Sequence, residues 1–221
     1  MDQRKIKVSK NGPYIVKGGI PLSEQTIITD NDGYSHEWRG SKEYPRRENY
    51  VLCRCGQSKG KPFCDRTHWK VDFNGTETAS QEPYLDRANE IDGPALRLTD
   101  AKNLCSIARF CHRAGGIWKL TRESDNPEAK RTAIEEAANC PSGRLVVWDK
   151  KTEETIEPDF DQSIGLVEDP EKGVKGPIWV RGAIPVESAD GISYEIRNRV
   201  TLCRCGKSSD KPFCDGSRIQ K

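Results

Sequence analysis

The hydrophobic and polar positions of this chain form short, interrupted runs, and one of these runs occurs twice. Residues 12–22, Gly-Pro-Tyr-Ile-Val-Lys-Gly-Gly-Ile-Pro-Leu, match residues 176–186, Gly-Pro-Ile-Trp-Val-Arg-Gly-Ala-Ile-Pro-Val. Both are β-branched or aromatic runs broken by Gly and Pro, a pattern that predicts a strand, a turn and a strand. Residues 194–203 alternate apolar and polar side chains, as a half-buried strand does. The sequence therefore predicts two similar β-rich units.

The segment between the repeats has a different pattern and contains the strongest helix signal. Asn126 supplies a cap, Pro127 suits the first helical position, and residues 128–139 are rich in Ala and Glu. Residues 145–148, Leu-Val-Val-Trp, predict a strand. This segment is therefore expected to be a separate α/β unit.

Together these patterns predict an α+β protein of three parts. Each repeat is too small to bury a core alone, so we expect the two to pack together as an intramolecular pseudo-dimer around the inserted middle domain. The expected parts are residues 1–82, 83–170 and 171–221. A monomer with internal pseudo-symmetry is favoured over an obligate dimer.

Composition narrows the class of protein. Hydrophobic residues make up 34% of the chain and charged residues 32%, against about 45% and about 25% in average proteins, so the cores should be small and bound metal is one candidate for extra stabilisation. Lys and Arg total 36 and Asp and Glu 34, a balance that gives no reason to expect nucleic acid or an anionic membrane as partner. The first residues contain no apolar signal region, and no run of about 18 apolar residues occurs. We expect a soluble, cytoplasmic protein.

The cysteines carry the chemistry. Nine cysteines cannot all pair in internal disulfides, and a reducing compartment favours metal ligation. Cys53-x-Cys55-x8-Cys64-x3-His68 offers three thiolates and an imidazole, the ligands of zinc or of an iron-sulfur cluster. Zinc sites usually take cysteines two to four residues apart, whereas one intervening residue suits two thiolates on one iron of a two-iron cluster. Cys64 and His68 then remain for the other iron.

The residues around these ligands resemble the CDGSH iron-sulfur family, which includes mitoNEET. Eight of the nine specified positions of the family pattern are present, namely Cys53, Cys55, Ser58, Pro62, Cys64, Asp65, Thr67 and His68. Arg66 departs, because the family has Gly there. The resemblance implies a 2Fe-2S cluster with three cysteine ligands and one histidine ligand. A neutral imidazole in place of a thiolate raises the potential of a cluster and allows electron transfer to couple to protons. A structural zinc site is the alternative.

A second motif repeats the first in identical register but lacks the histidine. Its cysteines are Cys203, Cys205 and Cys214, and Arg218 stands where the pattern has histidine. A guanidinium stays protonated and offers no lone pair, so Arg218 should not ligate iron. The fourth ligand is left open between Asp215, Ser217 or a solvent species, a residue from elsewhere such as His36, and a labile or vacant site. A second cluster is still expected, because the three thiolates keep their spacing.

The middle segment contains the other cysteines, Cys105, Cys111 and Cys140. With the following Pro141 they resemble single-cluster ferredoxins, which implies a ferredoxin-like middle domain holding a 3Fe-4S cluster, or a 4Fe-4S cluster with an extra ligand such as His112. Residues 100–110, however, also have a helical pattern. On a continuous helix Cys105 and Cys111 would point about 120° apart, too far for one compact cluster. Buried structural cysteines are therefore the equal alternative.

Three functions are compatible with these motifs. The first is a non-enzymatic redox protein that transfers electrons, senses redox state or donates clusters to a protein partner that the sequence does not name. The second is a structural zinc-binding interaction module. The third is a cluster-bearing subunit of an oxidoreductase. The chain has no nucleophile elbow, phosphate loop or paired-carboxylate signature, so hydrolase or kinase chemistry has no support.

Overall fold

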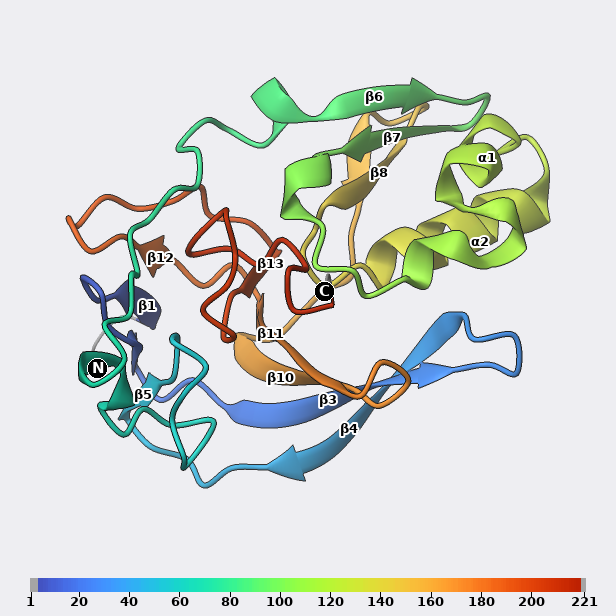
Figure 1. The fold of residues 1–221 in the computed structure, drawn as a ribbon. Helices are drawn as coiled ribbons and strands as arrows, with labels where there is room; N and C mark the ends of the chain where they lie inside the picture. The colour runs from blue at the N-terminus through green and yellow to red at the C-terminus, as the bar shows by residue number, and fades with distance from the viewer. Residues whose placement is uncertain (1–3, 220–221) are drawn as a thin grey trace.

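The computed structural model describes residues 4–219, which form three β-sheets and two α-helices, joined by short 3₁₀ turns and loops (Figure 1). The mixed α+β composition is therefore confirmed, with strands far outnumbering helices. No helix in residues 4–219 combines the length and the apolar composition needed to cross a membrane.

The first sheet is built mainly by the first repeat. Its strands, in the order β12–β1–β2–β5, are β12 (Val186–Glu187), β1 (Lys5–Val8), β2 (Tyr14–Lys17) and β5 (Asn49–Leu52). In the antiparallel pair β2 and β5, Tyr14 lies opposite Leu52. In the parallel pair β1 and β12, Ile6 lies opposite Val186. A strand of the second repeat thus completes the sheet of the first.

The second sheet repeats this arrangement with the roles exchanged. Its strands, in the order β13–β11–β10–β3–β4, are β13 (Arg199–Leu202), β11 (Val174–Arg181), β10 (Ser163–Asp169), β3 (Leu22–Thr29) and β4 (Ser35–Glu43). Ile178, which matches Tyr14 in the repeat, lies opposite Leu202. Ile164 on β10 lies parallel and opposite Leu22 on β3, a strand of the first repeat. The second repeat therefore lends β12 to the first sheet, and the first repeat lends β3, with β4 beside it, to the second sheet.

The predicted strands of the repeats are largely confirmed. Residues 12–22 form β2, a turn and the start of β3, and residues 176–186 form most of β11, a turn and the start of β12. The strand expected over residues 194–203 is shorter, since only Arg199–Leu202 pairs with β11. Residues 163–169, which the expected boundary at residue 170 assigns to the middle part, form β10 in the sheet of the second repeat.

The first repeat is longer because it carries a hairpin arm made of β3 and β4. Trp38 on β4 packs against Phe110 and Trp179, with ring centroids 4.8 and 4.7 Å apart. Its Nε1 donates to the carbonyl oxygen of Asn139 at 3.1 Å. The arm therefore connects the first repeat to the middle segment.

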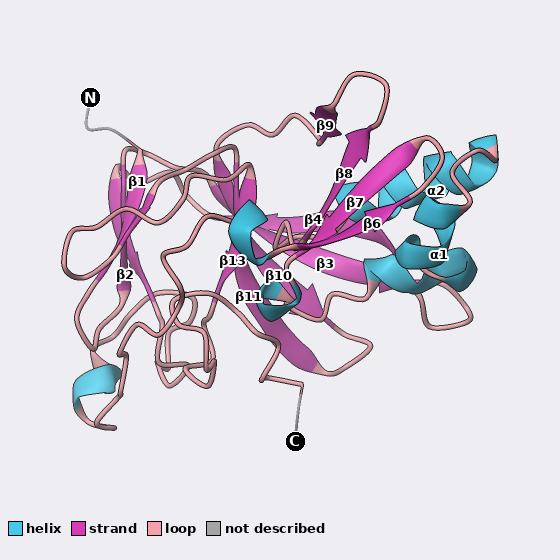
Figure 2. Cartoon of the chain, turned by 90° about the horizontal axis from the view of Figure 1, so that it is seen from above, coloured by secondary structure: helices cyan, strands magenta, loops and turns pink. Residues whose placement is uncertain are grey.

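The middle segment is an antiparallel sheet with two helices on one face, seen at the right of Figure 2. Its elements are β6 (Asn89–Asp92), β7 (Leu96–Asp100), β8 (Leu145–Asp149), β9 (Glu154–Ile156), α1 (Ile117–Arg122) and α2 (Pro127–Ala138). Alternate strand residues such as Leu96 and Leu98 pack against Ile117 and Ala133 of the helices. The predicted helix is confirmed as α2. Its predicted cap is confirmed too, since the Asn126 side chain accepts from two backbone N–H groups of the first turn. The predicted strand over residues 145–148 is β8.

The helix expected over residues 100–110 is wrong. After β7 the chain makes a 3₁₀ turn at Lys102–Leu104 and then an irregular loop, and a second 3₁₀ segment begins at Phe110. Ile107 and Arg109 have φ values of +52° and +66°, which no right-handed helix contains. The apolar residues of this stretch are buried in different places, Leu104 in the main core and Ala108 beneath the hairpin arm. The apolar residues are spaced as in a helix because one irregular loop places its side chains in two different hydrophobic cores.

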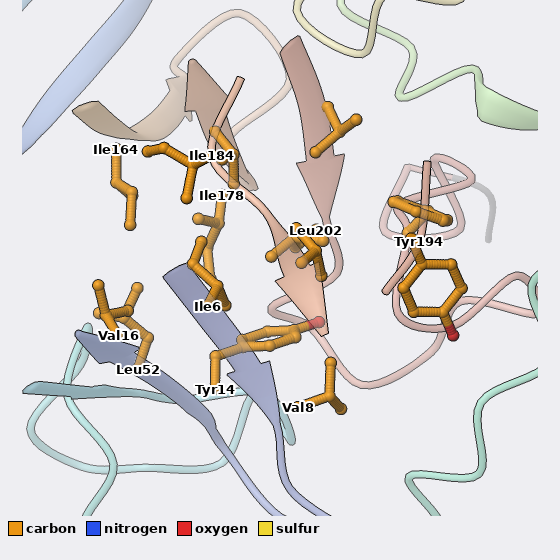
Figure 3. Close-up of a cluster of buried hydrophobic side chains, with 14 of the residues drawn as sticks. Ile6, Val8, Tyr14, Val16, Leu52, Ile164, Ile178, Ile184, Tyr194 and Leu202 are labelled. Atoms are coloured by element: carbon orange, nitrogen blue, oxygen red, sulfur yellow. The ribbon is translucent and has the colours of Figure 1, made fainter. Parts of the chain in front are cut away.

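The main hydrophobic core lies between the first two sheets (Figure 3). Alternate strand positions of both repeats face it, among them Ile6, Val16, Ile164 and Leu202, each no more than 1% exposed. Both repeats thus contribute to a single core, from whose edge the two cysteine loops extend.

Candidate metal centres

The first cysteine motif begins where β5 ends. Cys53 and Cys55 are buried, and their Sγ atoms lie 3.8 Å apart. Two thiolates on one tetrahedral metal with bonds of about 2.3 Å lie about 3.8 Å apart, so this pair is already spaced for one metal. Cys64 Sγ lies 3.5 Å from Nδ1 of His68, which is 6% exposed. The four predicted ligands therefore occur as two pairs.

Backbone hydrogen bonds bring these pairs together. The N–H of Cys53 donates to the carbonyl of Pro62 at 2.8 Å, and the N–H of Cys64 donates to that of Val51 at 3.0 Å. Burial raises the pKa of the Cys64 thiol, and the nearby Cys53 adds to that rise. Without metal the Cys64 thiol thus holds its proton, and binding a metal must release it. No three Cys, His, Asp or Glu side chains in residues 4–219 converge as ligands of a single ion.

An aspartate closes the loop of each motif. The Asp65 carboxylate accepts from the N–H groups of Lys59 and Thr67 at 2.7 and 3.0 Å. The Thr67 side chain, together with these N–H groups, holds the pKa of Asp65 well below the usual range. Asp215 accepts in the same way from Ser209 and Ser217, at 2.7 and 3.0 Å. These carboxylates are therefore occupied in shaping the loops, which argues against Asp215 as a ligand.

Arg66, the one departure from the family pattern in the first motif, adopts the conformation of the glycine it replaces. Its φ is +68°, and that of Gly216, the matching residue of the second motif, is +82°. The left-handed conformation costs a non-glycine residue about 1–2 kcal/mol. The Arg66 side chain lies over the ring of Trp69, which is 69% exposed. The departure therefore preserves the loop geometry.

The second motif reproduces the cysteine geometry of the first. The Sγ atoms of Cys203 and Cys205 lie 3.6 Å apart, and the N–H of Cys214 donates to the Thr201 carbonyl at 2.9 Å. The hydrogen bond from Cys205 lowers the pKa of Cys203 to about 6, while that of Cys205 is raised. Burial raises the pKa of Cys214 to about 11, against the opposing charge of Arg218. The hydrogen bond between the two thiols thus favours the thiolate form of Cys203.

The other candidates for the fourth ligand of this site are placed as follows. Ser217 Oγ donates to the Asp215 carboxylate at 2.5 Å. His36 lies on β4, at the edge of the second sheet opposite to β13. Four strand spacings separate these edges, about 19 Å, so His36 does not reach the second motif. Arg218 Nη1 lies 3.5 Å from Cys214 Sγ, the separation that His68 has from Cys64.

The middle cysteines line one cavity. Cys105 and Cys111 lie on the irregular loop, Cys140 follows α2, and all three line the same small pocket. Burial raises the pKa of Cys111 to about 12, and the neighbouring Cys140 and Cys105 add to the rise. Because residues 100–110 are not helical, the 120° divergence expected for Cys105 and Cys111 does not arise. His112 packs instead against Trp118, with ring centroids 5.8 Å apart.

The three cysteine sites are in contact in a fixed order. A Cβ added at Gly56 would lie 2.6 Å from the carbonyl oxygen of Cys205, and one added at Gly206 would lie 2.7 Å from that of Cys55. The loops of the first and second motifs therefore touch reciprocally. A Cβ at Gly216 would lie 2.3 Å from Ile107 Cδ1, so the second motif also touches the middle loop. The second site lies between the other two.

Several supporting residues were not anticipated from the sequence. The Tyr14 hydroxyl donates to the carbonyl of Cys203 at 2.7 Å and to that of Pro212 at 3.0 Å, so the first repeat holds the second cysteine loop. Arg199, 1% exposed, donates from Nε to the Cys140 carbonyl at 2.8 Å. Arg54 donates to the carbonyls of two flanking loops. The role of Arg54 could have been suspected from the sequence, because both motifs contain the same Cys-Arg-Cys tripeptide.

Comparison with known families agrees with these sites. The family model described as iron-binding zinc finger CDGSH type matches residues 11–69 and 175–217, and a second, described as divergent 4Fe-4S mono-cluster, matches residues 91–150. The chain matches no curated protein. The two matched families cover all nine cysteines, since Cys53 to Cys64 and Cys203 to Cys214 lie in the first and Cys105 to Cys140 in the second.

Proposed function

Because this chain is a CDGSH-type iron-sulfur protein in which a segment similar to divergent 4Fe-4S mono-cluster proteins lies between the two motifs, we propose that it transfers electrons through three clusters in series. A cluster, when bound, takes up and releases single electrons. The protein supplies the ligands, the order of the sites and the exclusion of water. It acts on a protein partner, without an enzymatic active site of its own.

The donor set of the first motif fits a 2Fe-2S cluster. Cys53 and Cys55 are 3.8 Å apart, as ligands of one iron, and Cys64 and His68 are 3.5 Å apart, as ligands of the other. His68 is 6% exposed, so the protein shields this end of the site from solvent. We assign Cys53, Cys55, Cys64 and His68 as the ligands.

The donor set of the second motif fits the same kind of cluster with three protein ligands. Cys203 and Cys205 have the spacing of a pair on one iron, and Cys214 is buried at 3% exposure beside them. No histidine of residues 4–219 lies at this site, so the fourth ligand of the second cluster is not a neutral imidazole. We assign Cys203, Cys205 and Cys214 as ligands and exclude Arg218, which lacks a lone pair.

The cysteines of the middle segment supply the donor set of a third cluster. These three cysteines come from two separated elements and face one space, as the single thiolate ligands of a multi-iron cluster do. Their number favours a 3Fe-4S cluster, or a 4Fe-4S cluster with a ligand from outside this set. We assign Cys105, Cys111 and Cys140 as ligands.

The reciprocal strand exchange supports the pseudo-dimer as the scaffold of the two CDGSH sites. Ile6 pairs with Val186 as Ile164 pairs with Leu22, so the exchanges are related by the repeat. The exchange keeps the two cysteine loops against each other.

The contact of each cysteine loop with the next is the observation that carries the proposal. Gly56 lies against the Cys205 carbonyl and Gly216 against Ile107, two residues from Cys105. Metals that only stabilise the fold do not need to lie in neighbouring loops that contact one another. Sites in direct contact favour the passage of electrons from one to the next.

Quantitation of iron, acid-labile sulfide and zinc, with visible absorption, tests the proposal. We expect iron and sulfide at all three sites and a coloured protein whose absorption bleaches on reduction. Variants that replace two cysteines of one site by Ser should each remove one cluster and leave the other two. A colourless protein that holds zinc without iron or sulfide would refute the proposal in favour of a structural zinc module.

A further inference from the structure

The two CDGSH motifs differ at several positions, and in the second motif two of these differences lie against the middle loop. Gly216 matches Arg66, and Arg218 matches His68. A side chain at position 216 would collide with Ile107, since even a Cβ would lie 2.3 Å from its Cδ1. The glycine is therefore needed for the second motif to approach the middle loop, a contact that Arg66 could not make.

Arg218 makes two contacts that belong to different sites. Its Nη1 lies 3.5 Å from the Sγ of Cys214, and the same nitrogen donates to the carbonyl of Ser106 at 2.8 Å. Ser106 is buried and follows Cys105 directly. The guanidinium thus joins a ligand of the second site to the backbone beside a ligand of the middle site.

The rest of the guanidinium has no partner among the described residues. Both Nε and Nη2 of Arg218 are buried and make no hydrogen bond within residues 4–219. Buried N–H groups of a cation are costly unless an acceptor or an anion lies against them. The neighbouring thiolates, with the sulfides of a cluster, are such an anion.

We propose that Arg218 is a positioning residue that takes the place of a histidine ligand: it donates to the Cys214 sulfur, neutralises part of the charge of the second cluster, and fixes this site to the middle loop through Ser106. This inference rests on the proposed function, since it concerns a cluster held by Cys203, Cys205 and Cys214. A fixed positive charge favours the reduced, more negative form of a cluster.

The potential of the second cluster, measured by redox titration followed by electron paramagnetic resonance, tests the proposal in the whole protein. Arg218→Gln should lower this potential and leave that of the first cluster unchanged. Lys207→Gln is the matched control, because Lys207 is an exposed cation in the same motif, two residues after Cys205. It should shift the potential much less. Arg218→Lys keeps the charge and should restore most of the potential.

Arg218→His provides a second, independent arm. It places an imidazole where the first motif has one, so the reduced spectrum of the second cluster should approach that of the first. The contact with Ser106 is lost in this variant, so the magnetic interaction between the second and middle clusters should weaken.

Two results would overturn the inference, and they are distinguishable. If Arg218→Gln and Lys207→Gln shift the second potential equally, Arg218 has no special role, while the proposed function stands. If replacing Cys203 and Cys205 by Ser leaves the iron and sulfide content unchanged, the second site holds no cluster. The proposed function then fails at that site, and the inference with it.

Discussion

Gly56→Ala tests the contact between the two CDGSH loops. Gly56 has a φ of +75°, and a Cβ there would lie 2.6, 2.9 and 3.0 Å from three backbone atoms of Cys205. A left-handed Ala costs about 1–2 kcal/mol, and overpacking against backbone that cannot rotate away costs about 1–3 kcal/mol more. We therefore expect a loss of about 3 kcal/mol in the free energy of unfolding.

Gly33→Ala is the control for backbone strain alone. Gly33 has a φ of +80° but no atom within 4 Å of an added Cβ, so only the cost of the left-handed conformation remains, about 1 kcal/mol. At about 3 °C per kcal/mol for a chain of this size, the midpoint of thermal unfolding should fall by roughly 9 °C in Gly56→Ala and roughly 3 °C in Gly33→Ala.

The assay is thermal unfolding followed by circular dichroism, with both variants at the same iron content as the wild type. Gly206→Ala, the reciprocal change, should resemble Gly56→Ala, because its Cβ would lie 2.7 Å from the Cys55 carbonyl. Equal midpoints for Gly56→Ala and Gly33→Ala would refute the reasoning, since the loops would then not be in contact.

Three further predictions concern single buried groups. His68→Cys should lower the potential of the first cluster and abolish its pH dependence in a redox titration, because an anionic thiolate replaces a neutral imidazole that exchanges a proton. Tyr14→Phe should lower the free energy of unfolding in urea by about 1–3 kcal/mol, because the buried carbonyls of Cys203 and Pro212 lose their hydroxyl donor. Burial raises the pKa of Glu136 to about 8, so the folded protein holds a proton that the unfolded chain releases, and stability falls as the pH rises from about 4.5 to 8. Glu136→Gln has no such proton, so its stability relative to the wild type should increase between pH 6 and pH 9 in thermal unfolding.

Each of these predictions has an opposing result. An unchanged curve of potential against pH in His68→Cys would exclude His68 as a ligand. A Tyr14→Phe variant as stable as the wild type would show that water or another donor serves the two carbonyls. Parallel stability curves for the wild type and Glu136→Gln would mean that Glu136 is ionised in the folded protein throughout this range.

The sequence was most informative about the first motif and the strands of the repeats. Residues 12–22 and 176–186 are strand, turn and strand because their β-branched runs and Gly-Pro breaks are local signals. The pairs of donors in the first motif likewise follow from spacing along a short loop. The exchange of β3 and β12 was not predictable in detail, because the pairing of Leu22 with Ile164 depends on two segments far apart in the chain.

The middle loop and the second site depend even more on tertiary contacts. Ile107 and Arg109 have positive φ values, which neither residue prefers, and only packing around the cavity holds them there. The helical spacing of apolar residues over 100–110 therefore gave a wrong prediction of a helix. Arg218 was recognised as a missing ligand, but its contact with Ser106 spans 112 positions and is visible only in the fold.

Electron paramagnetic resonance tests the central claim, three cluster sites in contact in the order first, second, middle, when it is recorded at intermediate potentials as well as in the oxidised and the reduced protein. We expect the signals of neighbouring clusters to be broadened by magnetic interaction. Replacing Cys203 and Cys205 by Ser should remove the second cluster and with it the broadening of both remaining signals. Three sharp, independent signals in the wild type, unchanged in shape when the second cluster is removed, would contradict the serial arrangement.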